Sequence, residues 1–358
     1  MRAIRYAAYV LACCLVFYLA ALAVATVYIN VIGSTRVVDA EEDSQAIYGG
    51  VGPPAIIYGR RPLLQTGPEL IVLGASDALV GLRPPELSSR LGGMRVHNLS
   101  LNSGRMADFE TLVSLAYEII PPRNRRNVTF VIGVFYGNFY GLRDSRNFGD
   151  STILDAEAHR FGLYAGSGHS LRPRVPRALL PTFLLALRPI VIASESWHDL
   201  TSLYSSAIDA GLGIKHKKEF YPQALQKLPE AERRKVIMKL RLDDHDPNGK
   251  KYVLDPGRLQ EMVNLAQRIS AEGSRLIVVD LPIPSWHADE APNFHLYQWE
   301  KRPYFSKLSA FPHVYYVNMQ DGFADETFYD STHPFPNATA QWAARLSTAI
   351  APILRERD

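Results

Sequence analysis

The stretch that decides the fold is Leu70-Ile71-Val72-Leu73-Gly74-Ala75-Ser76-Asp77. A short apolar run of this kind is typical of a strand buried on both faces, as strands of parallel sheets are. In open α/β sheets, ligand sites form beyond the carboxyl ends of the strands. Ser76 follows such an end between small residues, so its hydroxyl can face a substrate while its backbone N–H stays free. Taken alone, this serine could equally be a small turn residue.

Outward from this strand, apolar runs alternate with segments of helical spacing. Further strands are expected at residues 95–99, 128–134, 276–280 and 314–317, and helices at 106–120, 256–272 and 338–354. Strands that alternate with helices imply parallel pairing. We therefore predict an α/β fold, a three-layer α/β/α sandwich around a five-stranded parallel sheet, in a domain that covers residues 69–358.

The N-terminus carries a long apolar segment, with no charged residue from Ala7 to Ile32. About 20 apolar residues span a bilayer as a helix, so residues 1–33 are predicted to be a transmembrane anchor. Arg2 and Arg5 precede the segment and acidic residues follow it, which places the N-terminus in the cytoplasm and the domain outside. A cleaved signal peptide is the alternative, although its apolar region is usually shorter, about 7–15 residues.

Two segments lack a clear pattern. Residues 34–68 contain an acidic cluster and a stretch rich in glycine and proline, and are predicted to be a connector. Residues from about 150 to 255 are predicted to be a mostly helical insertion in the domain. The basic and apolar part from Arg172 to Ile192 could cap the sheet, which we favour, or lie on a membrane or a partner.

The composition excludes several classes of function. A net charge of +3 over 358 residues is too small to indicate nucleic-acid binding, and no run of five like charges is present. Cys13 and Cys14 are the only cysteines and lie in the apolar segment, which excludes a disulfide framework or a cysteine zinc site in the domain. No histidine or carboxylate group has the spacing of a metal site, and no glycine-rich phosphate loop is present. We therefore expect neither a metal nor a cofactor.

A second motif, Asp330-Ser331-Thr332-His333, immediately precedes the last predicted helix. A serine hydroxyl is a poor nucleophile unless a base removes its proton. His333 can act as that base for Ser76, and Asp330 can fix the tautomer of the imidazole and stabilise the imidazolium. These three residues are the predicted catalytic residues. By itself, the Asp330–His333 pair could also be a loop hydrogen bond that caps the helix.

Acyl transfer also needs hydrogen-bond donors aimed at the oxyanion of the tetrahedral intermediate. The turns after the second and third predicted strands contain Gly104 and Asn138. A backbone N–H of Gly104 and the side-chain amide of Asn138 could serve beside the N–H of Ser76. The alternative is that the glycine merely permits a tight turn and the asparagine merely tolerates one.

Together these features resemble the SGNH hydrolase superfamily, also called GDSL-type esterases, from about Glu69 to the C-terminus. The resemblance assigns one residue or pair to each family block: Ser76 to the nucleophile, Gly104 to the glycine, Asn138 to the asparagine, and Asp330 with His333 to the last. It also implies that the N–H groups of Ser76 and Gly104 and the amide of Asn138 form the oxyanion hole. The sequence departs from the family where Gly-Asp-Ser reads Gly-Ala-Ser and where Asn138 lies in Gly-Asn-Phe.

Within the superfamily, the chain is similar to membrane-anchored envelope proteins that O-acetylate bacterial exopolysaccharides, such as the alginate acetylation proteins, and to the D-alanyl transfer protein of teichoic acid modification. Such proteins commonly work beside a polytopic membrane-bound O-acyltransferase. The resemblance implies a single-pass protein of the bacterial inner membrane, with its catalytic domain in the periplasm or outside the cell.

Three functions stay open. The first is a serine O-acyltransferase that passes an acyl group, expected to be acetyl, from Ser76 to a hydroxyl of a polysaccharide. The second is a periplasmic carbohydrate or lipid esterase that uses the same residues, and the third is a non-catalytic scaffold that binds polysaccharide or a membrane partner. Five aromatic side chains could stack on sugars or simply pack in the fold: Tyr136, Phe139, Tyr140, Trp286 and Trp299.

Overall fold

The structure is a computed structural model that describes one α/β domain and an N-terminal helix. The residues described are 2–31, 68–101, 104–142, 164–165, 172–174, 228–236, 252–335 and 337–355. The connector predicted at 34–68 lies outside them, apart from Pro68. Most of the insertion predicted at about 150–255 also lies outside them, including most of its part from Arg172 to Ile192.

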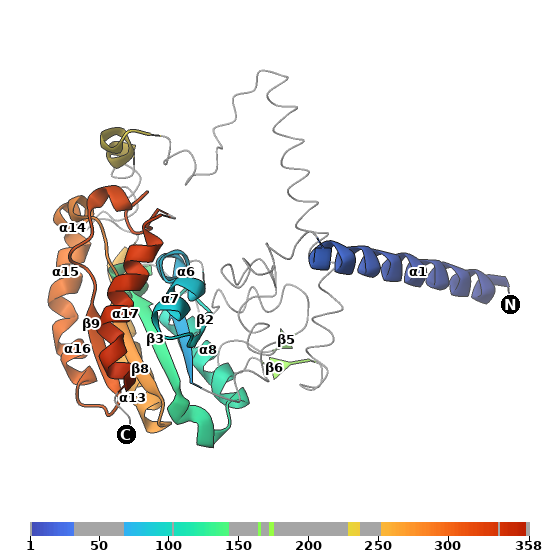
Figure 1. Ribbon diagram of the computed structural model, residues 1–358, viewed down its shortest axis with the longest axis horizontal. Helices are drawn as coiled ribbons and strands as arrows, with labels where there is room; N and C mark the ends of the chain where they lie inside the picture. Colours follow the sequence, from blue (N-terminus) through green and yellow to red (C-terminus); the bar gives the residue numbers. More distant parts are fainter. Residues whose placement is uncertain are drawn as a thin grey trace.

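The centre of the domain is a five-stranded sheet in which all strands run parallel (Figure 1). Its strands are β1 (Glu69–Gly74), β2 (Arg95–Asn98), β3 (Val128–Val134), β8 (Arg275–Asp280) and β9 (Val314–Asn318). Their order across the sheet is β2-β1-β3-β8-β9. The prediction of an α/β fold with a five-stranded parallel sheet is confirmed, and β1 lies inside the sheet as its apolar run requires.

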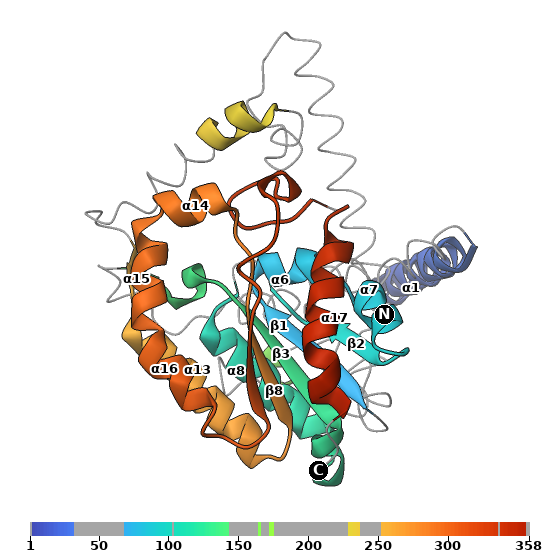
Figure 2. The ribbon, with the colours of Figure 1, turned by 60° about the vertical axis from the view of Figure 1, so that its left-hand side comes forward.

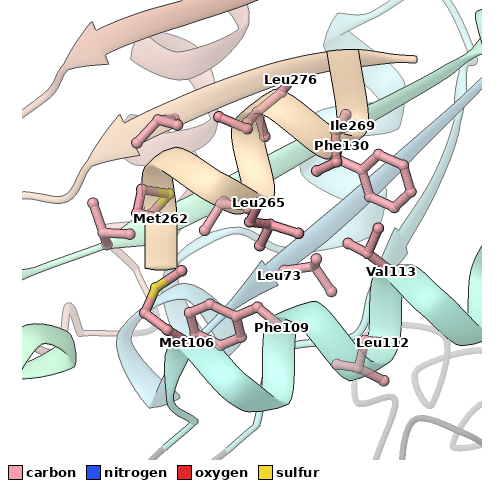
Figure 3. Packing of buried hydrophobic residues seen from close by; sticks show 14 of the residues in the cluster. Leu73, Met106, Phe109, Leu112, Val113, Phe130, Met262, Leu265, Ile269 and Leu276 are labelled. Atoms are coloured by element: carbon pink, nitrogen blue, oxygen red, sulfur yellow. The ribbon is translucent and has the colours of Figure 1, made fainter. Parts of the chain in front are cut away.

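Side chains of β1 alternate between two apolar clusters. Ile71 belongs to the cluster that contains residues of α8 (Met106–Ile119) and α13 (Pro256–Ala271). Figure 3 shows side chains from these two helices meeting beside the sheet. Leu70 belongs to the other cluster, which contains residues of α17 (Thr339–Arg355). Burial on both sides explains why the strand is an uninterrupted apolar run rather than an alternating one.

The remaining elements surround the sheet (Figure 2). They are α6 (Ser76–Gly81), α7 (Pro84–Arg90), η1 (Pro122–Asn127), η2 (Tyr136–Phe139), β4 (Tyr140–Leu142), β5 (Tyr164–Ala165), β6 (Arg172–Pro173), β7 (Tyr252–Leu254), α14 (Ser285–Glu290), α15 (Pro292–Glu300), α16 (Arg302–Leu308) and η4 (Asp325–Thr327). β4 and β7 pair antiparallel. The described segments on either side of residues 143–251 therefore lie side by side.

The N-terminal segment forms one continuous helix, α1 (Arg2–Val31). Its stretch Ile4–Ala21 has a mean hydropathy of 1.8 over 18 residues, enough for a membrane span. A helix of 30 residues is long enough to cross a bilayer. Its side chains between Ile4 and Ala21 are mostly exposed, as expected of a surface that lipid would cover.

Candidate active site

Ser76 and the Asp330–His333 motif lie together at the carboxyl end of β1. Ser76 is the first residue of α6, which starts directly after the strand and its single linking residue, Ala75. Asp330 and His333 lie in the loop between β9 and α17. The sheet topology therefore brings together two motifs that are far apart in the sequence, at the edge where α/β sheets form ligand sites.

Two hydrogen bonds connect the three side chains in series. Nε2 of His333 lies 2.8 Å from Oγ of Ser76, and Nδ1 of His333 lies 2.8 Å from Oδ2 of Asp330. Because an ionised carboxylate only accepts hydrogen bonds, the imidazole proton belongs on Nδ1. Nε2 then has its lone pair directed at the Ser76 hydroxyl, which is the arrangement a general base needs.

Asp330 is held in the ionised form. Burial alone would raise the pKa of its carboxyl, but the hydrogen bond and charge of His333 and two backbone N–H groups outweigh it and hold that pKa below its ordinary value. Those N–H groups belong to Thr332 and His333, and each donates to Oδ1 of Asp330 over 2.8 Å. The carboxylate is thus charged at neutral pH and fixed in orientation.

The loop that carries His333 is closed on itself. The N–H of Tyr329 donates to the carbonyl of His333 over 3.0 Å, and the N–H of Phe335 donates to the carbonyl of Thr327 over 2.8 Å. The ring of Tyr329 also stacks on the imidazole, with centroids 5.5 Å apart and an angle of 8° between the planes. These contacts fix the ring plane of His333. Nothing in the sequence distinguishes Tyr329 as a partner of the imidazole.

The predicted oxyanion donors are only partly in place. Asn138 lies in η2, where its Oδ1 accepts from the N–H of Phe135 over 2.8 Å and its Nδ2 donates to the carbonyl of Gly104 over 3.1 Å. An amide carries two hydrogens, so Nδ2 has a second one to donate. The N–H of Ser76, at the start of α6, has no acceptor within its helix.

The N–H of Gly104, a predicted oxyanion donor, is already hydrogen-bonded in this structure. Its N–H donates to the carbonyl of Leu101 over 2.9 Å, so in this structure it is engaged in a turn rather than directed at an oxyanion. A side chain at this position would not fit, because a Cβ would lie 2.9 Å from the carbonyl oxygen of Gly74 and 3.0 Å from the ring of Phe109. The glycine is therefore needed for close packing beside β1, and its carbonyl orients Asn138.

A second carboxylate, Asp77, lies beside the three side chains and has no counterpart in the predicted site. It is 1% exposed. Oδ1 of Asp77 accepts from the N–H of Ala78 over 2.9 Å, and within the described residues Oδ2 has no hydrogen-bond partner. Burial raises the pKa of Asp77 to about 6, although the nearby charge of His333 acts in the opposite direction. Asp77 is thus a buried acid whose charge acts on the imidazole.

Replacing Asp77 by asparagine should change stability and pH dependence in predictable directions. A carboxyl whose pKa is raised on folding binds its proton more tightly in the folded state, so stability falls as the pH rises from about 4 to about 6. Asp77→Asn should therefore stabilise the fold by up to about 3 kcal/mol above this range and by little below it. Denaturant unfolding at a series of pH values measures this difference, and an equal effect at every pH would contradict it.

The same variant should move the acidic limb of the pH–activity profile toward lower pH. The ionised Asp77 stabilises the imidazolium of His333, and without that charge the imidazole releases its proton more easily. Activity measured between the acidic and neutral range would show the shift. An unchanged limb would mean that Asp77 does not influence His333.

Four of the five aromatic candidates for sugar stacking are packed in the fold. Phe139 is completely buried, and the side chains of Tyr136, Tyr140 and Trp286 are nearly so. Only Trp299 among the five is exposed, at 66%, and the guanidinium of Arg302 lies over its ring. The other four side chains therefore pack in the fold, as the alternative to sugar stacking predicted.

Comparison with known proteins adds no relative to this picture. No family model matches the chain, and no curated protein matches its sequence. The geometry of Ser76, His333 and Asp330 is therefore what points to a function.

Proposed function

We propose that the protein is a serine acyl-transfer enzyme in which Ser76, His333 and Asp330 form a catalytic triad. The observation that carries this proposal is the pair of 2.8 Å hydrogen bonds that connects the three side chains in the order nucleophile, base and carboxylate. The residue types, their order and their place at the carboxyl edge of a parallel sheet all fit this chemistry.

In the first half-reaction, Oγ of Ser76 attacks the acyl carbon of the donor while Nε2 of His333 takes the hydroxyl proton. The tetrahedral intermediate carries its charge on the former carbonyl oxygen, where the N–H of Ser76 and the second amide hydrogen of Asn138 are the available donors. The intermediate collapses as the bond to the leaving group breaks, and the imidazolium returns the proton to that group. An acyl ester of Ser76 remains.

In the second half-reaction, His333 removes the proton from a sugar hydroxyl, whose oxygen attacks the acyl carbon. Oγ of Ser76 then leaves and regains its proton from the imidazolium, so that the product is a sugar ester and the enzyme is restored. Water in place of the sugar would give hydrolysis on the same residues. An esterase is therefore an outcome that the experiment below has to separate from transfer.

We infer a three-layer α/β/α sandwich of the SGNH hydrolase type as the setting of this triad. Support comes from the alternation of β1 side chains between two apolar clusters and from the position of Ser76 directly after β1. The turn at Gly104 departs from the family pattern, because the N–H of this residue is bonded to Leu101. The oxyanion hole we propose therefore uses Ser76 and Asn138.

The N-terminal helix supports a place at the membrane. We infer that α1 anchors the protein in the inner membrane, with the domain on the periplasmic or outer side, since Arg2 and Arg5 precede the uncharged segment that starts at Ala7. An anchored enzyme stays near an acyl donor delivered through the membrane, which favours transfer to a polysaccharide over release to water. A polytopic O-acyltransferase is the partner that would supply the donor.

The test uses the full chain in detergent micelles, a chromogenic acetyl ester as donor and an oligosaccharide as acceptor. Acetate release and the mass of the acceptor are followed together, with Ser76→Ala as the matched inactive control. Acetylated acceptor that is absent with Ser76→Ala supports transfer. Acetate release without acceptor modification, also lost in that variant, would replace the transferase by an esterase. Equal turnover by both proteins would overturn the proposal of an acyl-serine enzyme.

A further inference from the structure

A short segment of the insertion, residues 228–236, lies against the edge of the domain that carries the candidate active site. Figure 2 draws its helical part, residues 230–236, in yellow beside α14. Nη2 of Arg234 pairs with Oε1 of Glu290 at 2.6 Å, and its guanidinium lies 5.8 Å from the ring centre of Trp286. These contacts place the segment beside α14, but the ion pair is exposed on both sides and contributes little to holding it there.

The neighbouring residue, Arg233, points to the loop that carries His333. Its guanidinium carbon lies 4.9 Å from the ring centre of Phe335. Phe335 packs edge-to-face with Tyr329, with centroids 5.8 Å apart, and Tyr329 stacks on His333. Two aromatic rings therefore separate the guanidinium from the imidazole.

The charge of Arg233 is buried against an aromatic ring. It is only 8% exposed, and in the part of the chain that the structure describes no carboxylate lies within ion-pair distance of it, although Glu230 and Glu232 are on the same segment. Burying an unpaired charge is unfavourable, and a contact with a phenyl ring offsets this only in part. Arg234 shows the contrasting case, since its side chain is 44% exposed and already paired with Glu290.

A guanidinium offers five N–H donors in a planar fork that matches a carboxylate or a phosphate. The ring of Phe335, whose centre lies 4.9 Å from the guanidinium carbon, supplies no oxygen acceptor, so the N–H donors can bind another group. A bound oxyanion would supply both the counter-charge and the hydrogen-bond acceptors for this guanidinium.

We propose that Arg233 binds an anionic group, a carboxylate or a phosphate, on the polysaccharide that accepts the acyl group. The proposal rests on the proposed function, in which His333 acts on the acceptor hydroxyl. The bound anion belongs to another unit of the acceptor chain than the one acylated, because Tyr329 and Phe335 lie between Arg233 and His333. Arg233 is thus a specificity residue that selects acidic over neutral polymers.

The experiment measures binding by calorimetry with the full chain in detergent micelles, in the Ser76→Ala background so that no acyl transfer occurs. The probes are tetragalacturonate, a tetramer of glycerol phosphate and the neutral sugar maltotetraose. At least one anionic probe should bind about tenfold or more tightly than maltotetraose, and Arg233→Gln should remove that difference. The control Arg234→Gln should change the affinity by less than about threefold, because its ion pair is exposed. The two anionic probes show whether the site takes a carboxylate or a phosphate.

Three results would overturn the proposal: equal affinity of Arg233→Gln and Arg234→Gln for the anionic probe, equal affinity of the neutral and anionic probes, or no binding of any probe. Because binding is measured without chemistry, the result is independent of the acyl-transfer test. If turnover does not depend on Ser76 but anion binding depends on Arg233, the catalytic triad is rejected and the anion site is supported. If acyl transfer depends on Ser76 but no anionic probe is preferred, the triad is supported and the anion site is rejected.

Discussion

The Ser76→Ala variant is expected to lose nearly all acyl transfer, by about 10⁶-fold in kcat, which is the loss typical of removing the nucleophile of a triad that works as a unit. Without Oγ no covalent ester forms, and the hydrogen bond of 2.8 Å to Nε2 of His333 is lost with it. Steady-state assays with a chromogenic ester measure the loss of kcat. Unchanged unfolding of the variant would show that the fold is intact.

A graded series separates a triad from three independent residues. His333→Ala should be as damaging as Ser76→Ala, and the double variant should be no worse than either, because each removes the same step. Asp330→Asn should cost about 10⁴-fold in kcat, since an amide can favour the wrong tautomer of the imidazole. If the loss of kcat in the double variant equals the product of the two single losses, Ser76 and His333 do not act in the same step. An Asp330→Asn protein with undiminished kcat would also contradict the triad.

The parts of this molecule that follow from periodicity could be predicted from sequence. β1 and β3 are apolar runs because both faces of each are buried, and the helix at Pro256–Ala271 ends close to Gly273, whose φ of 77° suits glycine. The meeting of Ser76 with the Asp330–His333 motif could be predicted too, because parallel strands bring their carboxyl ends to one edge.

Other features depend on contacts that leave no sequence pattern. α15 buries only Asn293 and Tyr297, so its apolar periodicity is too weak to predict a helix. The turn that engages the N–H of Gly104 is decided by the carbonyl of Leu101, which composition does not reveal. Arg233 is one of many basic residues in the insertion, and its burial leaves no mark in the sequence.

The largest expected loss of stability comes from replacing Lys301 by methionine. Asp280 ends β8 and is completely buried, and Nζ of Lys301 is hydrogen-bonded to its Oδ2. Hydroxyls of Tyr297 and Tyr316 and the amide of Gln320 also donate to this carboxylate, over 3.1, 3.0 and 3.0 Å. Among the described residues Lys301 is the one cation paired with Asp280, and removing the partner of a buried carboxylate typically costs about 3–5 kcal/mol.

The loss should depend on pH with a defined sign. Burial raises the pKa of Asp280 and Lys301 opposes that rise, so Lys301→Met raises the pKa further. The folded state then binds the proton more tightly than the unfolded state does, and stability falls as the pH increases. Denaturant unfolding of the full chain should therefore find the variant weakest at alkaline pH and partly recovered at acidic pH.

Two control variants decide whether the buried charge is the cause. Lys307→Met removes an exposed lysine from α16, the helix that starts directly after Lys301, and should change the free energy of unfolding by less than about 0.5 kcal/mol. Asp280→Asn combined with Lys301→Met leaves no buried charge and should recover stability at alkaline pH. A double variant as unstable as Lys301→Met would assign the loss to the contacts of the ammonium group with the rings of Tyr297 and Phe305 instead. Since Gln320 starts the segment that leads to Asp330 and His333, loss of this network should also loosen the candidate active site.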